Sequence, residues 1–548
     1  GTHTVGTLTI NNVTQTFMAG GMITSGTAGI TLGTGTMTTN APTFRAFNSY
    51  TQPGVRTLVT LGSLFGTASS APAFTGPGDF IISSSLGTNV NGLTKTGFGN
   101  LTLRGTGRAT NALSNFTAGG GSLILDYANM PALTDLLATN TPLVFSGGTL
   151  AFQGRSGVAS NQTFGAVTLN AGGGRMFMNL NGATSGSFLL GGITITGSGG
   201  ALLVGTFSSA GTVSSSVGLI NNLLGGTARV IFYDGTNYRF ASKVPGATNN
   251  ILTGTTGTTL ANTALGGSLN YELAGGLALT QGNQSLNSLR INSTAASQSL
   301  SSTGSLSLTS GGLLYVGSLD YTVTGSLLSG TLNNPDLLIH QFGAGTLTIS
   351  GTITQTLVTG SHQSLTKTGP GRLVLSGSNQ FTGSVYVNEG ILSMTGPGAT
   401  ETGWNRLGTT AARTVFLNGG TFQITGAAGY ALTNKTFSIG SAGAVLDIGA
   451  STFTLGTTAN TLTGTGDLLL GGQTTTDGVL SLAIGNNLSG DIYAQKGVVR
   501  VSNATGAGTG VLVISSGAAL DVQVASVANR LALMGTGTYG TGVLTNSS

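Results

Sequence analysis

Apolar and polar residues alternate along this chain in short runs, and Gly, Asn or Ser closes each run. In the stretch 365–396 the runs are Leu373–Leu375, Val385–Val387 and Ile391–Leu392. Alternation with a period of two predicts half-buried strands, and the Gly and Asn punctuation predicts turns. No run is long enough for a helix, and nothing recurs with the period of a helical turn. The pattern therefore predicts an all-β protein.

One motif occurs twice. Leu93–Leu103 reads LTKTGFGNLTL and Leu365–Leu375 reads LTKTGPGRLVL, and a weaker copy, FGAGTLTISG, occupies Phe342–Gly351. Looser relatives, in which Gly precedes alternating apolar residues, occur along the whole chain. Such internal repetition predicts a solenoid, in which each repeat forms one coil and buries its apolar face against its neighbours.

The motif resembles the autotransporter-associated β-strand repeat of very large secreted bacterial proteins. The two LTKTGxGxLxL blocks carry the resemblance, and the second continues as SGSNQFTGSVYVNEGILSM. Clear similarity covers residues 287–396 and 93–125. It implies a right-handed parallel β-helix on an extracellular or cell-surface chain.

Strand centres near residues 102, 124, 151, 168 and 194 suggest the length of a coil. About 22 residues per coil would give roughly 25 coils and a rod roughly 120 Å long. We expect coils over 1–224, a hairpin insertion at 225–262, coils with the clearest repeat at 263–396, a loop at 397–414, and coils again over 415–548. Repeat-like sequence at both ends suggests that each end is continued, by further chain or by another copy.

The segment Arg229–Phe240, RVIFYDGTNYRF, predicts two aromatic-rich strands around Asp234 and Gly235. Asp-Gly between alternating apolar strands is a strong hairpin signal. We expect the hairpin to project from the solenoid, or to pack along its side. Its candidate contact residues are Tyr233, Asp234 and Tyr238.

The loop at 397–414 is the second candidate contact surface. It holds the chain's one tryptophan, Trp404, close in sequence to Glu401, Arg406 and Arg413. Charge is concentrated there in a chain with few charges. Trp404 and Arg406 are therefore the candidate contact residues of this loop.

Composition narrows the classes of function. Charged residues make up 6% of the chain, with a net charge of +5, and glycine accounts for 94 residues. Basic residues form no run interleaved with aromatic residues, which argues against nucleic-acid binding. The low charge weakens repulsion between copies and favours self-association. Cysteine is absent, and no apolar segment is long enough to cross a membrane as a helix.

The sequence shows no catalytic, cofactor or metal motif, and we expect the chain not to be an enzyme. Asp447 and Asp467 lie about one coil apart and could stack around a cation, although unrelated acids exposed on turns are the simpler interpretation. His340 and His362 are also about one coil apart, which we take as coincidence. Lys95 and Lys367 occupy the same place in the repeat, and we expect both to point outward, as solubilising charges or as a basic spot for an acidic glycan.

Three classes of function remain. The preferred one is an extracellular structural protein, a rigid solenoid that forms or decorates a cell-surface fibre and associates with itself head to tail. The alternative is an adhesin that binds surface glycans through the loops at 44–60, 225–262 or 397–414. A polysaccharide-active enzyme ranks third, because the chain has too few ionisable residues to supply a catalytic cleft.

Overall fold

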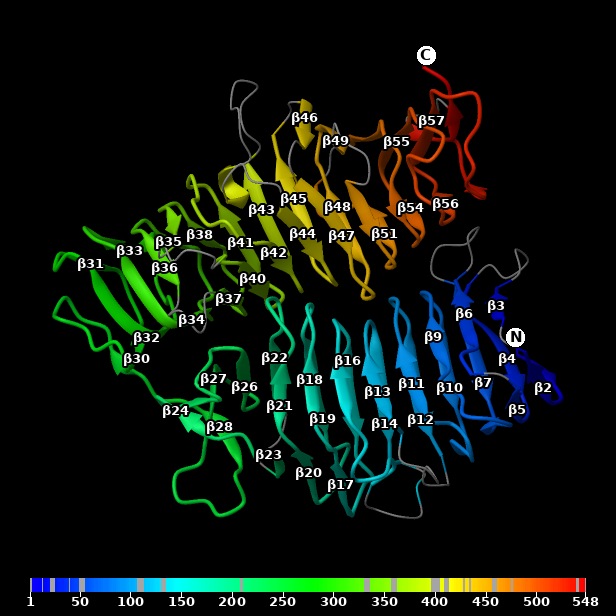
Figure 1. Ribbon diagram of the computed structural model, residues 1–548, viewed down its shortest axis with the longest axis horizontal. Coiled ribbons are helices and arrows are strands. Elements are labelled where there is room, and N and C mark those ends of the chain that lie inside the picture. The colour runs from blue at the N-terminus through cyan, green and yellow to red at the C-terminus, as the bar shows by residue number, and fades with distance from the viewer. Residues whose placement is uncertain are drawn as a thin grey trace. The chain divides into compact units, whose positions relative to one another are not determined.

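The chain forms two compact units (Figure 1). Unit 1 comprises Gly1–Gly218, Val230–Asn237 and Ala241–Gly254, and unit 2 comprises Leu219–Arg229, Tyr238–Phe240 and Thr255–Ser548. The computed structural model describes every residue except 1, 12, 20–24, 39, 49–54, 106–112, 129, 131–134, 207–209, 330–335, 356–361, 396–404, 409–412, 427–428, 433–434, 456–460, 475–476, 539–541 and 548.

Four sheets are built mainly from unit 1. The 12-stranded sheet runs in the order β1 (Thr2–Val5), β4 (Thr27–Leu32), β7 (Arg56–Leu61), β10 (Asp79–Ile82), β12 (Asn100–Arg104), β14 (Ser122–Asp126), β16 (Thr149–Gln153), β19 (Gly174–Asn179), β22 (Leu202–Thr206), β26 (Val230–Tyr233), β27 (Tyr238–Lys243) and β28 (Leu252–Gly254). The 8-stranded sheet runs in the order β21 (Ile193–Ile195), β18 (Val167–Leu169), β15 (Leu143–Phe145), β13 (Asn115–Ala118), β11 (Gly92–Lys95), β9 (Ala73–Thr75), β6 (Thr43–Phe47) and β3 (Thr14–Met18). The two 3-stranded sheets consist of β17 (Ala159–Thr163), β20 (Ser185–Leu190) and β23 (Gly211–Ser215), and of β2 (Leu8–Ile10), β5 (Gly35–Met37) and β8 (Leu64–Gly66).

Unit 2 contains three larger sheets. The 13-stranded sheet comprises β29 (Thr258–Thr259), β30 (Asn270–Leu273), β32 (Gln284–Ile291), β34 (Leu306–Tyr315), β36 (Leu327–Ser329), β37 (Leu337–Gln341), β39 (Ile353–Thr354), β40 (Leu365–Thr368), β42 (Val385–Val387), β44 (Arg413–Leu417), β47 (Lys435–Ile439), β50 (Leu462–Gly464) and β53 (Asn487–Leu488). The 12-stranded sheet comprises β31 (Leu277–Leu279), β33 (Gln298–Ser302), β35 (Tyr321–Val323), β38 (Leu347–Ile349), β41 (Arg372–Leu375), β43 (Ile391–Thr395), β45 (Thr421–Thr425), β48 (Ala444–Asp447), β51 (Leu468–Leu470), β54 (Ile492–Ala494), β56 (Leu512–Ile514) and β58 (Leu531–Leu533). The 6-stranded sheet comprises β46 (Gly429–Leu432), β49 (Thr452–Leu455), β52 (Val479–Leu482), β55 (Gly497–Val501), β57 (Ala518–Val522) and β59 (Leu544–Thr545). An antiparallel pair, β24 (Leu219–Ile220) with β25 (Leu223–Leu224), and a 3₁₀ turn, η1 (Asn405–Leu407), complete this unit's described elements.

Successive coils pair their strands in parallel, which confirms the predicted parallel β-helix. The solenoid has about 19 turns, fewer than the sequence spacing predicted. The coil length varies along the chain, because Phe80 pairs with Leu101 in a short coil, whereas Leu202 pairs with Val230 in a longer one. The strand centres used to predict the coil length also come from two different sheets. Residues 102, 124 and 151 lie in the 12-stranded sheet of unit 1, and residues 168 and 194 lie in the 8-stranded sheet.

The period-two pattern decides which side chains enter the interior. In β16, Leu150 and Phe152 are buried, and Thr149, Ala151 and Gln153 between them are half-buried on the outside. In unit 2, one continuous apolar cluster extends from Leu260 to Leu520. Each inward residue packs on the inward residue of the next coil, so the core is a set of stacked columns.

Segment 225–262 contributes to both units. β26 pairs in parallel with β22 and so extends the 12-stranded sheet of unit 1, whereas β27 and β28 pair antiparallel. The domain limits predicted from the sequence remain predictions.

Glycine allows adjacent coils to touch at the corners. A Cβ atom on Gly99 would lie 1.9 Å from the carbonyl oxygen of Gly78, and one on Gly121 would lie 2.0 Å from the carbonyl oxygen of Gly99. Any side chain there would force the coils apart, so the glycine of the repeat's Gly-x-Gly is a spacing requirement.

The repeated lysines are internal, and the outward orientation expected for them is wrong. Lys95 and Lys367 are fully buried. The Nζ atom of Lys95 donates to the carbonyl oxygens of Thr96 and Gly97. The Nζ atom of Lys367 donates to the carbonyls of Thr368, Gly369 and Glu389, at 3.1, 2.6 and 3.0 Å.

These contacts explain why a lysine stands in the motif. The turn after the strand exposes carbonyl oxygens to an apolar interior, where unpaired acceptors are costly. The lysine stem fills the core while its amine binds those carbonyls. Burial lowers the pKa of Lys95 to about 7, and the charge of Asp79 partly opposes this change.

We predict that Lys367→Met destabilises unit 2. Methionine keeps the apolar stem and removes the donor from the buried carbonyls of Thr368 and Gly369 and from the half-buried carbonyl of Glu389. Each buried carbonyl left without a donor costs about 1–3 kcal/mol, whereas water can replace the donor at Glu389. The expected fall in the free energy of unfolding, measured by chemical denaturation, is about 2–4 kcal/mol. The matched control is Lys496→Met, because Lys496 is exposed and also donates to two carbonyls, of Gly472 and Thr474. Equal effects of the two substitutions would rule out this explanation.

Candidate binding surface

Tyr233 and Asp234 lie at an exposed turn of unit 1. Asp234 Oδ1 accepts hydrogen bonds from the backbone N–H groups of Thr236 and Asn237, at 2.8 and 2.7 Å. The hydroxyl of Tyr233 donates to the carbonyl of Gly235 at 2.8 Å, and Gly235 has a φ of 96°. The Asp234 carboxylate thus builds the turn while remaining in contact with solvent.

Tyr238 belongs to unit 2, where it packs. Its ring stacks on Phe342 with centroids 4.4 Å apart, and its carbonyl accepts a hydrogen bond from Arg290 Nε at 2.9 Å. The residues that the sequence placed together in one hairpin are therefore divided between two units.

Trp404 lies outside the residues that the structure describes, so its role as a contact residue remains a prediction. Arg406 is the middle residue of η1 and is half-buried. Its carbonyl accepts a hydrogen bond from Asn379 Nδ2 at 2.7 Å, which fixes η1 to the coil below. Arg406 as a contact residue remains a prediction.

The outer face of the 12-stranded sheet in unit 1 gives Tyr233 further neighbours. Register pairs Phe177 with Gly205 and Gly205 with Tyr233, so these three residues occupy one outward column on successive coils. Arg175 lies two residues before Phe177 on the same face, with its guanidinium carbon 6.0 Å from the Phe177 ring centroid. Sequence reasoning missed Phe177 and Arg175, although their alternation with the buried Met176 and Met178 was a visible signal.

Charged residues mostly tie one coil to the next. Arg104 Nε lies 2.7 Å from Asp126 Oδ2, and the two residues are register partners in β12 and β14. Arg500 Nε lies 2.8 Å from Asp521 Oδ2, again between register partners. Asp447 and Asp467, for which exposure on turns was the simpler interpretation of the sequence, are in fact buried. Four further aspartates are buried as well: Asp126, Asp336, Asp491 and Asp521.

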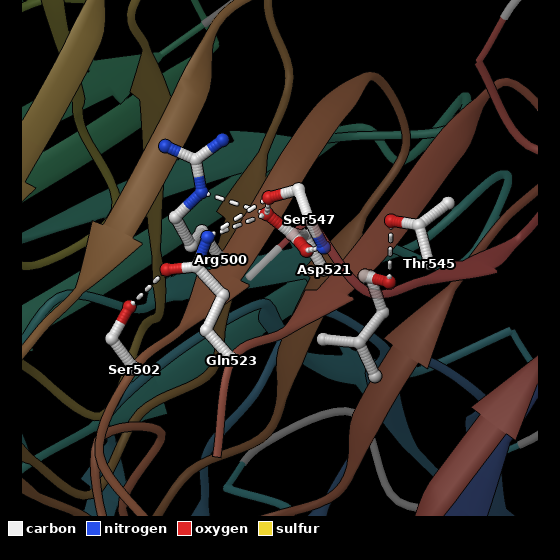
Figure 2. A network of polar contacts seen from close by, with 7 residues as sticks. Arg500, Ser502, Asp521, Gln523, Thr545 and Ser547 are labelled. Atoms are coloured by element: carbon white, nitrogen blue, oxygen red, sulfur yellow. Dashed lines mark hydrogen bonds and ion pairs between the residues drawn. The ribbon is translucent and has the colours of Figure 1, made fainter.

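Figure 2 shows the second of these ties, around Asp521. Besides Arg500, the carboxylate accepts the backbone N–H of Ser547 at 3.0 Å and its hydroxyl at 2.7 Å. Gln523 contacts Ser502 and Ser547 beside it, at 2.8 and 2.9 Å. Burial by itself would raise the pKa of Asp521, but the hydrogen bonds from Arg500 and Ser547 outweigh it, so the pKa lies below its usual value. The network fastens residues 544–547 to the coil before them.

A polar ladder on unit 2 explains Asp447 without a cation. Ser393, Gln423 and Asp447 are register partners on successive coils, and Gln423 Nε2 donates to Asp447 Oδ2 at 2.8 Å. Asp447 also accepts the backbone N–H groups of Gln473 and Thr474. Asp467 directly precedes β51, whereas Asp447 ends β48, and Leu446 pairs with Leu470. The two carboxylates therefore do not stack, as the less favoured interpretation of the sequence would have required.

His340 is buried in unit 2 and holds a neighbouring segment in place. Its Nε2 donates to the carbonyl of Ala228 over 2.7 Å, and its Nδ1 accepts from the hydroxyl of Thr368 over 2.6 Å. Burial lowers the pKa of His340 to about 4, so the ring is neutral at physiological pH. Beside it, Arg229 and Asp336 form a buried ion pair.

Among the described residues, no group of three or more His, Asp or Glu side chains could hold a metal ion. A small pocket in unit 2 is lined by Asp447, Thr474, Lys496 and apolar neighbours, and Asp447 and Lys496 there are already bonded to the loop at 472–474. No helix in the described part of the chain is long and apolar enough to cross a membrane.

Comparison with known proteins supports the resemblance seen in the sequence. Residues 365–394 match the family described as passenger-associated-transport-repeat. The chain is also 28% identical, over 346 residues, to the adhesin BmaC autotransporter of Brucella suis biovar 1 (strain 1330). That similarity covers 59% of this chain and 9% of the relative, so the chain spans a small fraction of the relative's length. No solved structure matches. The passenger-type repeat recognised in the sequence is thus confirmed for residues 365–394, and a larger part of the chain is similar to an autotransporter adhesin.

We predict that the Asp521 network makes the stability of its coil depend on pH. Because the folded-state pKa of Asp521 is depressed, its contribution to stability is present above the unfolded-state value, near 3.8, and is lost as the pH falls through the folded-state pKa. Asp521→Asn should remove this contribution and lower the amide-exchange protection of β57 and β59 about tenfold at pH 7, or about 1.4 kcal/mol.

Hydrogen exchange, corrected for intrinsic rates and measured at pH 3 and pH 7, checks this expectation. Asp234→Asn is the matched control, because its carboxylate lies on an exposed turn of unit 1. Identical pH profiles for the wild type and Asp521→Asn would show that the network does not hold the coil.

Proposed function

We propose that this chain is a surface-exposed passenger segment that acts as an adhesin, in which a rigid β-solenoid supports a recognition face. The observation that carries the proposal is the parallel pairing of strands from coil to coil within each unit, which makes a stiff support in a chain with few charges. The passenger-type repeat and the adhesin relative support the same function. An extracellular or cell-surface location is part of this proposal, as is a role without catalysis.

The arrangement of the side chains favours binding to a partner over catalysis. Aspartates and arginines are mutually bonded between coils, which leaves few ionisable groups to act on a substrate. Outward positions carry Thr, Ser, Asn and occasional aromatic side chains, which can bind a partner through many weak contacts. A long rigid support repeats such contacts without a large loss of conformational entropy on binding.

We predict that beads coated with the purified chain attach to cultured mammalian cells severalfold more than beads carrying an unrelated β-rich protein at the same density. The reason is that the folded chain presents its recognition face ready formed. Attachment is counted by microscopy under flow. Attachment no greater than that of the control beads would overturn the adhesive function.

End-to-end self-association is a second candidate, favoured by one observation. Exposed apolar side chains lie on strands of both units: Val5 in β1 is 49% exposed, and Leu531 in β58 and Leu544 in β59 are 43% and 52% exposed. Such side chains favour pairing of a strand with another chain.

We predict that Val5→Lys suppresses this association, because a charge on an edge strand opposes strand pairing. In sedimentation velocity, the wild-type coefficient should rise with protein concentration, and that of the variant should stay constant. Val244→Lys is the control, since Val244 is 39% exposed but lies away from β1 in the sequence and in the sheet order. A wild type that remains monomeric at every concentration would exclude assembly of this chain.

A further inference from the structure

We propose that residues 219–229 form an acid-released cover over the outer face of β30, β32, β34 and β37 in unit 2. The cover comprises the antiparallel pair of β24 and β25 and the segment 225–229. It is closed at neutral pH, and protonation of His340 beneath it favours its release. This conformational device goes beyond the adhesive function proposed above and does not depend on it.

Outward residues of this part of the sheet are buried, although one side of a solenoid strand normally contacts solvent. Leu313 and Ile339 point into the core cluster of unit 2. Leu314, Leu338 and His340 alternate with them along β34 and β37 and therefore face outward, yet each is at most 1% exposed. A further layer of the chain therefore lies over these strands.

Side chains of the sheet hold the backbone of this cover. Asn270 Nδ2 and Asn287 Nδ2 donate to the carbonyl of Asn221, at 2.9 and 3.4 Å. Two coils beyond Asn287, His340 Nε2 donates to the carbonyl of Ala228 at 2.7 Å. The cover therefore crosses the strands from β30 to β37.

Gly312 lets the cover lie directly on the sheet. A Cβ atom on Gly312 would lie 2.1 Å from the Cβ atom of Ala228 and 2.9 Å from the Cε1 atom of Phe240. Phe240 is 1% exposed, and its ring meets the ring of His340 edge to face, with centroids 6.0 Å apart. A side chain at position 312 would push the cover away, so this contact requires glycine.

The charges around His340 make the cover sensitive to pH. The charged and titratable groups on the elements around it are Arg229, Asp336, Lys367, Tyr386, Tyr238, Arg239, Glu272 and Arg290. Arg229 and Lys367 are positive and disfavour a further positive charge on His340. Asp336 is already paired with Arg229, and Glu272 lies between two arginines.

Protonation of His340 is therefore disfavoured while the cover is closed. The pKa of His340 is about 4 there, against 6.5 for an exposed histidine, mainly because of burial. Release hydrates the ring and restores the higher pKa, so the ring takes up a proton when the cover opens. The equilibrium constant for opening rises as the pH falls through 6.5 and levels off near 4, and at pH 5 it is about 30-fold larger than at pH 7.5.

A single cysteine beneath the cover measures its opening, because the chain has no cysteine of its own. Ser288→Cys is nearly isosteric, and Ser288 is fully buried in the register column between Asn270 and Gly312. Its rate of reaction with 4,4′-dithiodipyridine is divided by that of Ala278→Cys, at an exposed position in β31. We expect this ratio to rise about 30-fold between pH 7.5 and pH 5.

Three further substitutions in the Ser288→Cys background separate the cover from other causes. His340→Gln should make the ratio independent of pH. His362→Gln is the matched control, because His362 is an exposed histidine of unit 2, and it should leave the rise unchanged. Gly312→Val should raise the ratio already at pH 7.5, because the added side chain displaces the cover.

A ratio that does not rise in acid, or a rise that persists in His340→Gln, would overturn the proposal. A Gly312→Val ratio equal to that of its parent at pH 7.5 would do the same, and this result decides if His340→Gln fails to fold. Val323→Cys, at an inward position of the core cluster, detects unfolding of the whole unit. An equal rise there would show that acid unfolds the coils rather than releasing the cover, which also overturns the proposal.

Discussion

Parallel pairing of each coil with the next, in register, is the interaction on which the rest of the structure depends. It satisfies the backbone, stacks inward side chains into columns and fixes the distance between coils at about 4.8 Å. The backbones of adjacent coils must then lie very close at the corners, which is why glycine occupies the same corner on three successive coils, at Gly78, Gly99 and Gly121. The lysine of the repeated motif also serves the close packing of coils, because its amine donates hydrogen bonds to turn carbonyls that face the interior.

Most of the few charged residues described here serve to connect neighbouring coils. Arg104 with Asp126 and Arg500 with Asp521 connect register partners on adjacent coils, and Asp467 and Asp491 accept backbone N–H groups of the following coil. Charges used in this way are not available for recognition or catalysis. We therefore assign the proposed recognition to the outward positions, where uncharged polar and aromatic side chains repeat with the coil.

The family match and the outward column of Phe177, Gly205 and Tyr233 lie in different parts of the molecule. Residues 365–394 contain β40, β41, β42 and most of β43, together with Lys367 and its turn. These are the parts that build a coil. Phe177 and Tyr233 lie in unit 1, and their alignment through Gly205 depends on register between coils outside the two LTKTGxGxLxL copies. Similarity in the repeat thus indicates the architecture, and the outward residues can vary independently of it.

The sequence by itself determined the all-β class and the inward or outward side of most strand residues, because period-two alternation and glycine-rich turns are local signals. The internal repeats indicated a solenoid, and the resemblance to the autotransporter-associated repeat implied that its strands are parallel. The number of coils could not be predicted, since loops of different length make some coils longer than others without changing the strand pattern. Only the tertiary structure decided that Lys95 and Lys367 are buried, that Asp447 binds the loop at 473–474, and that the edge of the Phe177 ring lies against Gly205, beside Tyr233. Each of these depends on which residues of separate coils become neighbours, and that register is set by the whole stack.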